Sequence, residues 1–203
     1  MAVNLNSLRV QFSKQVFETT KFKNLARGVA LNKARAAQEE MVEEFEGHRV
    51  TQELDAGPNF AGNSIVNYFS EEGTPNLYSF IGFPAGTDPL KLLRELLKAP
   101  IEVRLTTRSK NSYYFKVLVP TVEDIEEATA MPDEYFSGNL SWARGVEDGD
   151  ILGIGQYLSV QASASRSGRG IQVKIKTDSS IEAVPYITDI LEAFRKRLQE
   201  LSK

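Results

Sequence analysis

Residues 20–46 carry the pattern that most restricts the fold, because apolar side chains recur there at helical spacing along one long segment. Thr20 is a suitable N-cap residue, and Gly47 stands where a left-handed C-cap residue belongs. The expected stripe comprises Phe22, Leu25, Val29, Met41, Val42 and Phe45, with Ala26, Ala30, Ala34 and Ala37 between them. The alanines thin this stripe, so we expect the helix to pack closely against a sheet or another helix.

Three shorter segments predict further helices. Residues 88–98 are rich in leucine, with Asp88 as the cap and Pro100 as the stop signal. An acidic helix begins after Thr121, whose hydroxyl is a suitable N-cap, and ends near residue 129. A last helix is expected over 185–201, because its apolar residues recur every three or four positions. A short helix around 139–147 is a further alternative within a glycine-rich stretch.

Other segments alternate or are short and apolar, which favours strands. The strand candidates are 7–12, 49–54, 63–69, 76–83, 101–108, 112–119 and 170–177. A three-residue turn at 109–111 joins two of them into a hairpin. Together the segments predict an α+β fold. A small, mostly antiparallel sheet is packed by the long N-terminal helix, a middle helix and a C-terminal helix.

The length of 203 residues fits one domain, given a usual size of about 150 residues per domain. We therefore expect a single domain over 1–203, with an N-terminal arm at 1–19. Seven of the fourteen glycines lie between Gly138 and Gly170, so residues 131–168 are expected to form a long glycine-rich loop or hairpin excursion.

Charge and composition exclude several classes of protein. The net charge of −3 and the pI near 5.4 argue against a protein that grips nucleic-acid phosphates over a large area. The chain has no cysteine, which excludes disulfides and thiolate chemistry. No apolar run reaches the roughly 18 residues of a membrane helix, and the first residues lack the pattern of a secretion signal. We expect no membrane association.

The run at 76–86 crowds large apolar side chains into a few residues and contains no group suited to acid–base or nucleophilic chemistry. It is either a buried strand or a surface for a partner, because aromatic residues also dominate subunit contacts. On the second interpretation, these side chains belong to a subunit or partner interface together with one tryptophan and two arginines. The predicted interface residues are Leu77, Tyr78, Phe80, Ile81, Phe83, Trp142, Arg166 and Arg169.

Candidate catalytic features each have a simpler structural interpretation. His48 is the only histidine, and without cysteine a zinc site is improbable, so we interpret it as structural. The acidic residues Glu123, Asp124, Glu126 and Glu127 are expected to form a solvated helix face. No serine has a base at a recognisable spacing. We therefore predict no catalytic residues, no metal and no cofactor.

The loop at 165–170 has the glycines and arginines of a phosphate-binding loop. Known phosphate loops run from a strand into a helix and carry a lysine, whereas this loop leads into a strand. A basic hairpin tip or a subunit contact is the favoured interpretation. A small hydrolase or nucleotide-binding enzyme remains the alternative from a different class.

Four segments together resemble the neck and tail-completion proteins of tailed bacteriophages. The segments are 46–54 (EGHRVTQEL), 76–83 (NLYSFIGF), 136–141 (FSGNLS) and 165–174 (SRSGRGIQVK). The resemblance extends over roughly 15–200. It implies a non-enzymatic virion protein at the head–tail neck, of the tail-terminator or tail-completion kind, assembled in the host cytoplasm.

The resemblance also implies partners. Identical subunits form a ring, often of six copies in the family, and contact the tail tube on one side and head-side connector or stopper proteins on the other. Genome DNA passes through the ring without specific binding. A head-closure stopper or a connector adaptor of the same neck is the alternative within this class.

Overall fold

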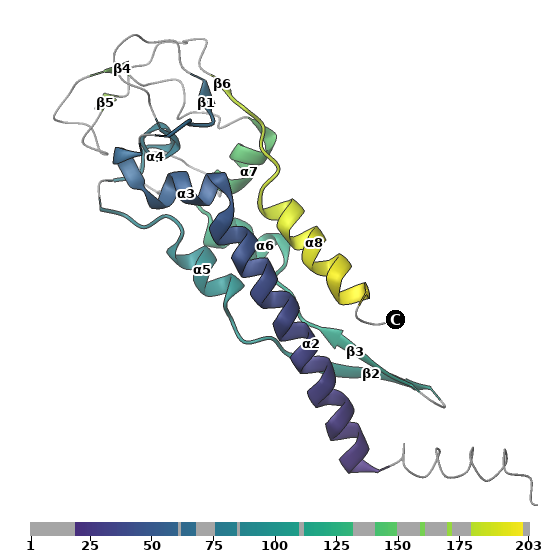
Figure 1. The fold of residues 1–203 in the computed structure, drawn as a ribbon. Helices are drawn as coiled ribbons and strands as arrows, with labels where there is room; N and C mark the ends of the chain where they lie inside the picture. Colours follow the sequence, from purple (N-terminus) through teal and green to yellow (C-terminus); the bar gives the residue numbers. More distant parts are fainter. Residues whose placement is uncertain are drawn as a thin grey trace, which may run out of the picture.

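The computed structural model describes residues 19–60, 62–67, 76–84, 86–109, 112–131, 141–149, 159–160, 170–171 and 180–200, and these form a small α+β fold. Figure 1 shows an elongated arrangement built along α2 (Thr20–Gly47). The shorter helices gather around the C-terminal half of α2, and a β-hairpin lies beside its N-terminal half. The predicted fold class is confirmed.

Helix α2 confirms the predicted long helix, with Thr19 instead of Thr20 as its N-cap. The Thr19 hydroxyl oxygen accepts the Phe22 N–H at 3.3 Å. At the other end, His48 has extended backbone and separates α2 from helix α3 (Arg49–Asp55). Its Nδ1 accepts the Val50 N–H at 3.3 Å and so caps α3. The prediction of a strand at 49–54 is therefore wrong.

The apolar run at 76–83 is also a helix, α4 (Leu77–Ile81), which corrects the strand prediction. The Asn76 side chain accepts the Ser79 N–H at 2.9 Å and caps the start of the helix. Gly82 has a φ of 84° and ends it in the left-handed conformation that glycine adopts without a Cβ penalty. All five helical residues are buried, so the run has no exposed face and no visible helical periodicity.

The remaining helices are η1 (Gly57–Asn59, a 3-10 turn), α5 (Lys91–Leu97), α6 (Val122–Ala128), α7 (Trp142–Asp148) and α8 (Ile187–Glu200). Three of them lie within segments predicted to be helical, but the one expected to begin at Asp88 begins at Lys91 with Leu90 as its N-cap, so the prediction of the Asp88 cap is wrong. The predicted Thr121 cap is confirmed, because Thr121 and Asp124 cap each other's backbone N–H groups in a capping box. Helix α7 lies within the glycine-rich stretch where a short helix was the alternative.

The described strands pair as antiparallel two-stranded ladders. The predicted hairpin is confirmed as β2 (Val103–Ser109) and β3 (Ser112–Val117), with Val103 opposite Val117. The other pairs are β1 (Val66–Asn67) with β6 (Ser180–Ile181), and β4 (Ser159–Val160) with β5 (Gly170–Ile171). The arm at 1–18, residues 172–177 and the excursion residues 132–140, 150–158 and 161–168 lie outside the described part of the chain.

The core lies where α8 packs against α2 and where α3, α4 and α7 close around them. Tyr186 is at its centre, stacked against Phe45 with ring centroids 6.1 Å apart. The Tyr186 hydroxyl forms a hydrogen bond with the Thr51 hydroxyl at 2.7 Å, which satisfies both buried groups. Burial raises the pKa of Tyr186 far above its ordinary value, so this hydroxyl keeps its proton.

Glu53 is a charged residue inside this core, with only 1% of its surface exposed. Its carboxylate accepts the backbone N–H of Leu77 at 2.6 Å and that of Ile65 at 3.2 Å. It also accepts a hydrogen bond from the Ser64 hydroxyl. One side chain of α3 thereby holds the start of α4 and the approach to β1 in place.

The N-terminal half of α2 departs from the predicted buried stripe. Leu25 is 63% exposed and Val29 is 50% exposed. Helix α8 and the short helices do not reach this half, and it packs against the β2–β3 hairpin on a different face. There the Phe22 and Tyr113 rings lie 6.2 Å apart. The burial prediction for Leu25 and Val29 was therefore wrong, because the helix extends beyond the core.

Candidate functional site

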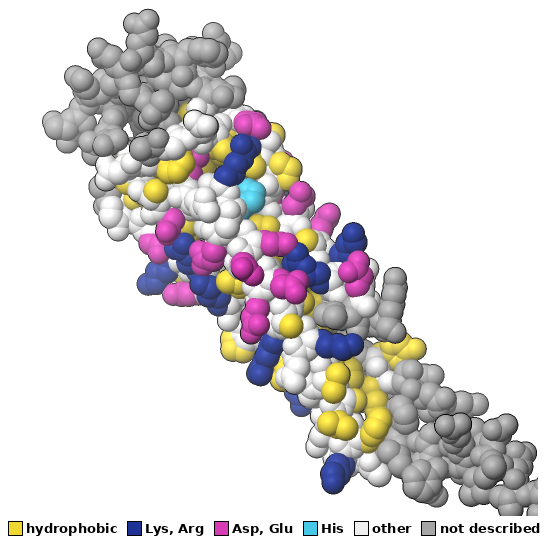
Figure 2. All heavy atoms as spheres, viewed as in Figure 1, with side chains coloured by type: hydrophobic (Ala, Val, Ile, Leu, Met, Phe, Trp, Pro, Cys, Tyr) yellow, Lys and Arg dark blue, Asp and Glu magenta, His cyan; other side chains and the backbone are white. Residues whose placement is uncertain are grey.

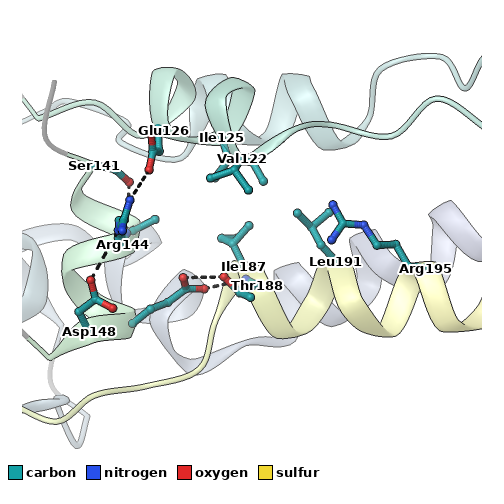
Figure 3. A pocket seen from close by; sticks show the side chains of 12 residues that line it. Val122, Ile125, Glu126, Ser141, Arg144, Asp148, Ile187, Thr188, Leu191 and Arg195 are labelled. Carbon is teal, nitrogen blue, oxygen red and sulfur yellow. Dashed lines mark hydrogen bonds and ion pairs between the residues drawn. The ribbon is translucent and has the colours of Figure 1, made fainter.

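A groove between α6, α7 and α8 is the clearest candidate binding site in the described structure. Its volume is about 300 Å³. Its lining residues come from all three helices, and they are Val122, Ile125, Glu126, Ser141, Ala143, Arg144, Glu147, Asp148, Ile187, Thr188, Leu191 and Arg195. Figure 3 shows α8 along one side of the groove and α6 along the other.

The floor of the groove is apolar. Ile125, Ile187 and Leu191 are each at most 8% exposed and pack into the core below. Val122 stands at the mouth with 57% of its surface exposed. Figure 3 shows Val122 and Ile125 pointing across the groove toward Ile187 and Leu191. Such a floor suits an apolar side chain of a binding partner.

The rim of the groove is polar, and most of its charges are already paired. Arg144 forms ion pairs with Glu126 at 2.8 Å and with Asp148 at 3.6 Å. The Glu126 carboxylate raises the pKa of Arg144 above its ordinary value. Glu147 accepts the backbone N–H of Thr188 at 2.6 Å and its hydroxyl at 2.8 Å. The rim thus adds little charge selectivity to the apolar floor.

Among the described residues that line the groove, no acid–base pair is assembled around a nucleophile. Ser141, its most obvious nucleophile candidate, is engaged as the N-cap of α7, because its Oγ accepts the Arg144 N–H at 3.2 Å. The same oxygen lies 2.7 Å from the Thr129 hydroxyl. No histidine lines the groove among the described residues. A serine hydroxyl without an adjacent base is a weak nucleophile.

His48 has the structural position that the sequence analysis predicted. Its ring lies against Tyr186 with centroids 4.7 Å apart, and it is half-buried. Burial lowers the pKa of His48 below 6.5, although a hydrogen bond to the Pro185 backbone opposes this shift. The imidazole is therefore largely neutral at neutral pH and accepts a hydrogen bond at the start of α3.

Six of the predicted interface residues are in the core of the chain. Each is at most 3% exposed, and they are Leu77, Tyr78, Phe80, Ile81, Phe83 and Trp142. Trp142 lies edge-on to Phe83, with ring centroids 6.2 Å apart. The buried interpretation is therefore the correct one for these side chains, since their aromatic area is already covered within the chain. Arg166 and Arg169 lie outside the described residues.

Tyr78 illustrates how the core uses a polar group of this run. Its hydroxyl donates to the Thr87 carbonyl at 2.9 Å and also lies against the Pro84 carbonyl. Burial raises the pKa of Tyr78 above 10. The hydroxyl therefore fixes the loop after α4 and is not presented to a partner.

Arg94 joins three separate parts of the chain in a surface ion-pair cluster. Its guanidinium lies 3.0 Å from Glu46, 2.8 Å from Asp55 and 3.8 Å from Asp88. Lys98 also pairs with Glu46 at 2.8 Å. The hydrogen bond from Arg94 is the main reason why the pKa of Glu46 is lowered from 4.5, although partial burial opposes the shift. No local sequence pattern indicates this cluster, because its members are far apart in the chain.

Replacing Arg94 with methionine is expected to lower the free energy of unfolding by about 1–2 kcal/mol at pH 7. The lowered pKa of Glu46 contributes stability that is present above pH 4.5 and is lost as the pH falls through the folded-state pKa. Urea unfolding of both proteins at pH 7 and pH 3 should therefore show a smaller difference at pH 3. Arg104→Met, in the exposed pair with Glu102, is the control. An equal difference at both pH values would contradict the assigned role.

The described residues contain no group of three or more acidic, histidine or cysteine side chains that could hold a metal ion. Within the same residues, no helix combines the length and apolar character needed to cross a bilayer. The acidic cluster on α6 confirms its predicted solvated character, since Glu123, Asp124 and Glu127 are exposed. The loop at 165–170 lies largely outside the described part of the chain.

No protein-family model matches this chain, and no curated protein or solved structure is significantly similar to it. Family membership therefore stays a proposal that rests on the chain's own residues.

Proposed function

We propose that this chain is a structural protein of the head–tail neck of a tailed bacteriophage, of the tail-terminator or tail-completion kind. Identical subunits form a ring that joins tail to head and lets genome DNA pass. The tail tube and the head-side connector are its other partners, and the virion is its location. The proposal involves no catalysis.

The observation that carries the proposal is the exposed apolar surface at the N-terminal half of α2. Leu25 and Val29, four residues apart on α2, are each at least half exposed. They lie on the part of the elongated subunit that extends beyond its core. Exposed apolar groups on a projecting element favour a protein that associates through this surface.

The groove between α6, α7 and α8 supports the same proposal. A ring with a head-to-tail interface needs two different adhesive surfaces on each subunit. The tail tube and the head-side connector need a further contact surface, and the apolar groove lies on a different part of the molecule from the projecting half of α2. The groove offers an apolar floor and paired rim charges, which suits a protein contact better than catalysis.

The proposal is tested by the place of the chain in phage particles. Cryo-electron microscopy of particles should locate it as a ring between the head and the tail tube. Removing its coding sequence should yield heads without joined tails, or tails of uncontrolled length. Normal, infectious particles that lack this chain would contradict the proposal.

A further inference from the structure

Helix α2 has a complete separation of charge along its length. Its five cationic residues all precede residue 36, and they are Lys21, Lys23, Arg27, Lys33 and Arg35. Its five acidic residues all follow residue 38, and they are Glu39, Glu40, Glu43, Glu44 and Glu46. This order opposes the helix dipole, which favours acids near the N-terminus and cations near the C-terminus. Helix stability therefore does not explain the pattern.

Interactions within the subunit explain part of the acidic half. Glu46 pairs with Arg94 and Lys98, and Arg197 of α8 pairs with Glu40 and Glu44. Glu39 and Glu43 form no ion pair within the described structure, and both are exposed. These two carboxylates are available to a charged partner.

The basic half has almost no such compensation. Lys21, Lys23, Arg27 and Arg35 are exposed and have no ion-pair partner among the residues that the structure describes. In Figure 2 the lower end of the molecule shows Lys, Arg and apolar side chains, whereas the acidic side chains lie over its middle and upper parts. Along α2 itself, the cations therefore lie toward the N-terminal end and the carboxylates toward the C-terminal end.

One face of α2 carries this separation in a continuous line. Its members follow one another at spacings of three or four residues, which places them on the same side of a helix. They are all exposed, and they are Lys21, Leu25, Val29, Asn32, Arg35, Glu39 and Glu43. The line extends over roughly 30 Å of helix. We call it the α2 face.

We propose that the basic half of the α2 face binds the acidic half of the α2 face of the next copy of this chain, so that each copy uses one half of the face for each of its two neighbours. This inference rests on the proposed association of identical subunits and specifies the surface that mediates it. Leu25 and Val29 supply apolar contact, and the unpaired cations meet Glu39 and Glu43. Contact between two basic halves is disfavoured by like-charge repulsion.

Charge also argues against two other occupants. A nucleic acid lying along the α2 face would meet the carboxylates of Glu39 and Glu43, which repel phosphate. The groove between α6, α7 and α8 is a poor acceptor for the basic half, because its acidic rim residues are paired internally and Arg195 adds a cation. A second copy offers both signs of charge in the required order.

The test uses the full chain and two charge-reversal variants. Lys21→Glu/Arg35→Glu reverses the basic half, and Glu39→Lys/Glu43→Lys reverses the acidic half. Each variant alone is expected to self-associate roughly tenfold more weakly than the original chain in sedimentation velocity. An equimolar mixture of the two should recover the original association, because opposite charges again face each other. Lys91→Glu/Lys196→Glu, on exposed parts of α5 and α8, is the control with the same change in net charge as Lys21→Glu/Arg35→Glu.

The recovery in the mixture shows that both variants fold and that the two halves meet directly. Unchanged self-association of both variants would contradict the proposal that the α2 face forms the contact between copies, while leaving the proposed ring intact. Weakened variants whose mixture stays dissociated would also overturn the proposed contact. An original chain that stays monomeric would refute the proposed ring itself, so the two failures are distinguishable. Loss of binding to double-stranded DNA in Lys21→Glu/Arg35→Glu, with unchanged self-association, would assign the basic half to nucleic acid instead.

Discussion

Replacing Glu53 with alanine is expected to lower the free energy of unfolding by about 3–5 kcal/mol. The carboxylate accepts the N–H groups of Leu77 and Ile65, and both of these backbone groups are buried. Without an acceptor, each buried donor costs about 1–3 kcal/mol of stability. The start of α4 and the approach to β1 would lose their common attachment point.

Chemical denaturation at pH 7 measures this effect. Glu53→Gln keeps one carbonyl acceptor and should recover part of the loss. Glu43→Ala removes an exposed carboxylate of α2 and should change the stability by less than about 0.5 kcal/mol. If Glu53→Ala were as stable as Glu43→Ala, Glu53 would not organise the core as described.

Replacing Trp142 with alanine is expected to cost about 3–5 kcal/mol, because the change leaves a large cavity in the core. The indole is 1% exposed and lies between Phe83 and Tyr186, with ring centroids 6.2 and 6.3 Å away. The side chain belongs to the part of the core that joins α4, α7 and the start of α8.

Thermal and chemical unfolding of Trp142→Ala should be compared with Tyr114→Ala, which removes an aromatic ring that is 55% exposed. The control is expected to unfold almost as the original chain does. Comparing these two variants also tests whether Trp142 is a core residue and not the interface residue that the sequence predicted. A Trp142→Ala protein of normal stability but impaired self-association would restore Trp142 to a subunit contact.

The long elements were predictable from the sequence because each presents one face to the core. Helix α8 and the β2–β3 hairpin show the 3.6-residue and two-residue periods that such faces produce. The cap of α6 was equally predictable, since the capping box is formed by residues three positions apart. Local physics determines these features.

Helices α3 and α4 were mistaken for strands because periodicity is a weak signal over five to seven residues. Helix α4 is buried on every side, so its apolar run resembles a central strand. The capping residues on either side of the run do indicate a helix, since Asn76 precedes it and Gly82 follows it. For α3, the capping residue is His48, which is a weaker signal in sequence.

The candidate site depended on contacts that the sequence does not reveal. The α6–α7–α8 groove is lined by residues from Val122 to Arg195. The Glu53 carboxylate accepts a hydrogen bond from the backbone N–H of Leu77, which lies far along the chain. Conversely, Leu25 and Val29 continue the helical pattern of α2 but have no core to enter. Whether a patterned residue is buried depends on where the other elements end.

The central claim is that this chain acts by association with copies of itself. The most direct measurement is the mass of the purified full chain in solution, by light scattering or sedimentation equilibrium over a range of concentrations. We predict a closed assembly whose mass is a whole multiple of 22.6 kDa, six for the ring that the phage resemblance implies. A folded protein that stays at 22.6 kDa at every concentration would contradict the account.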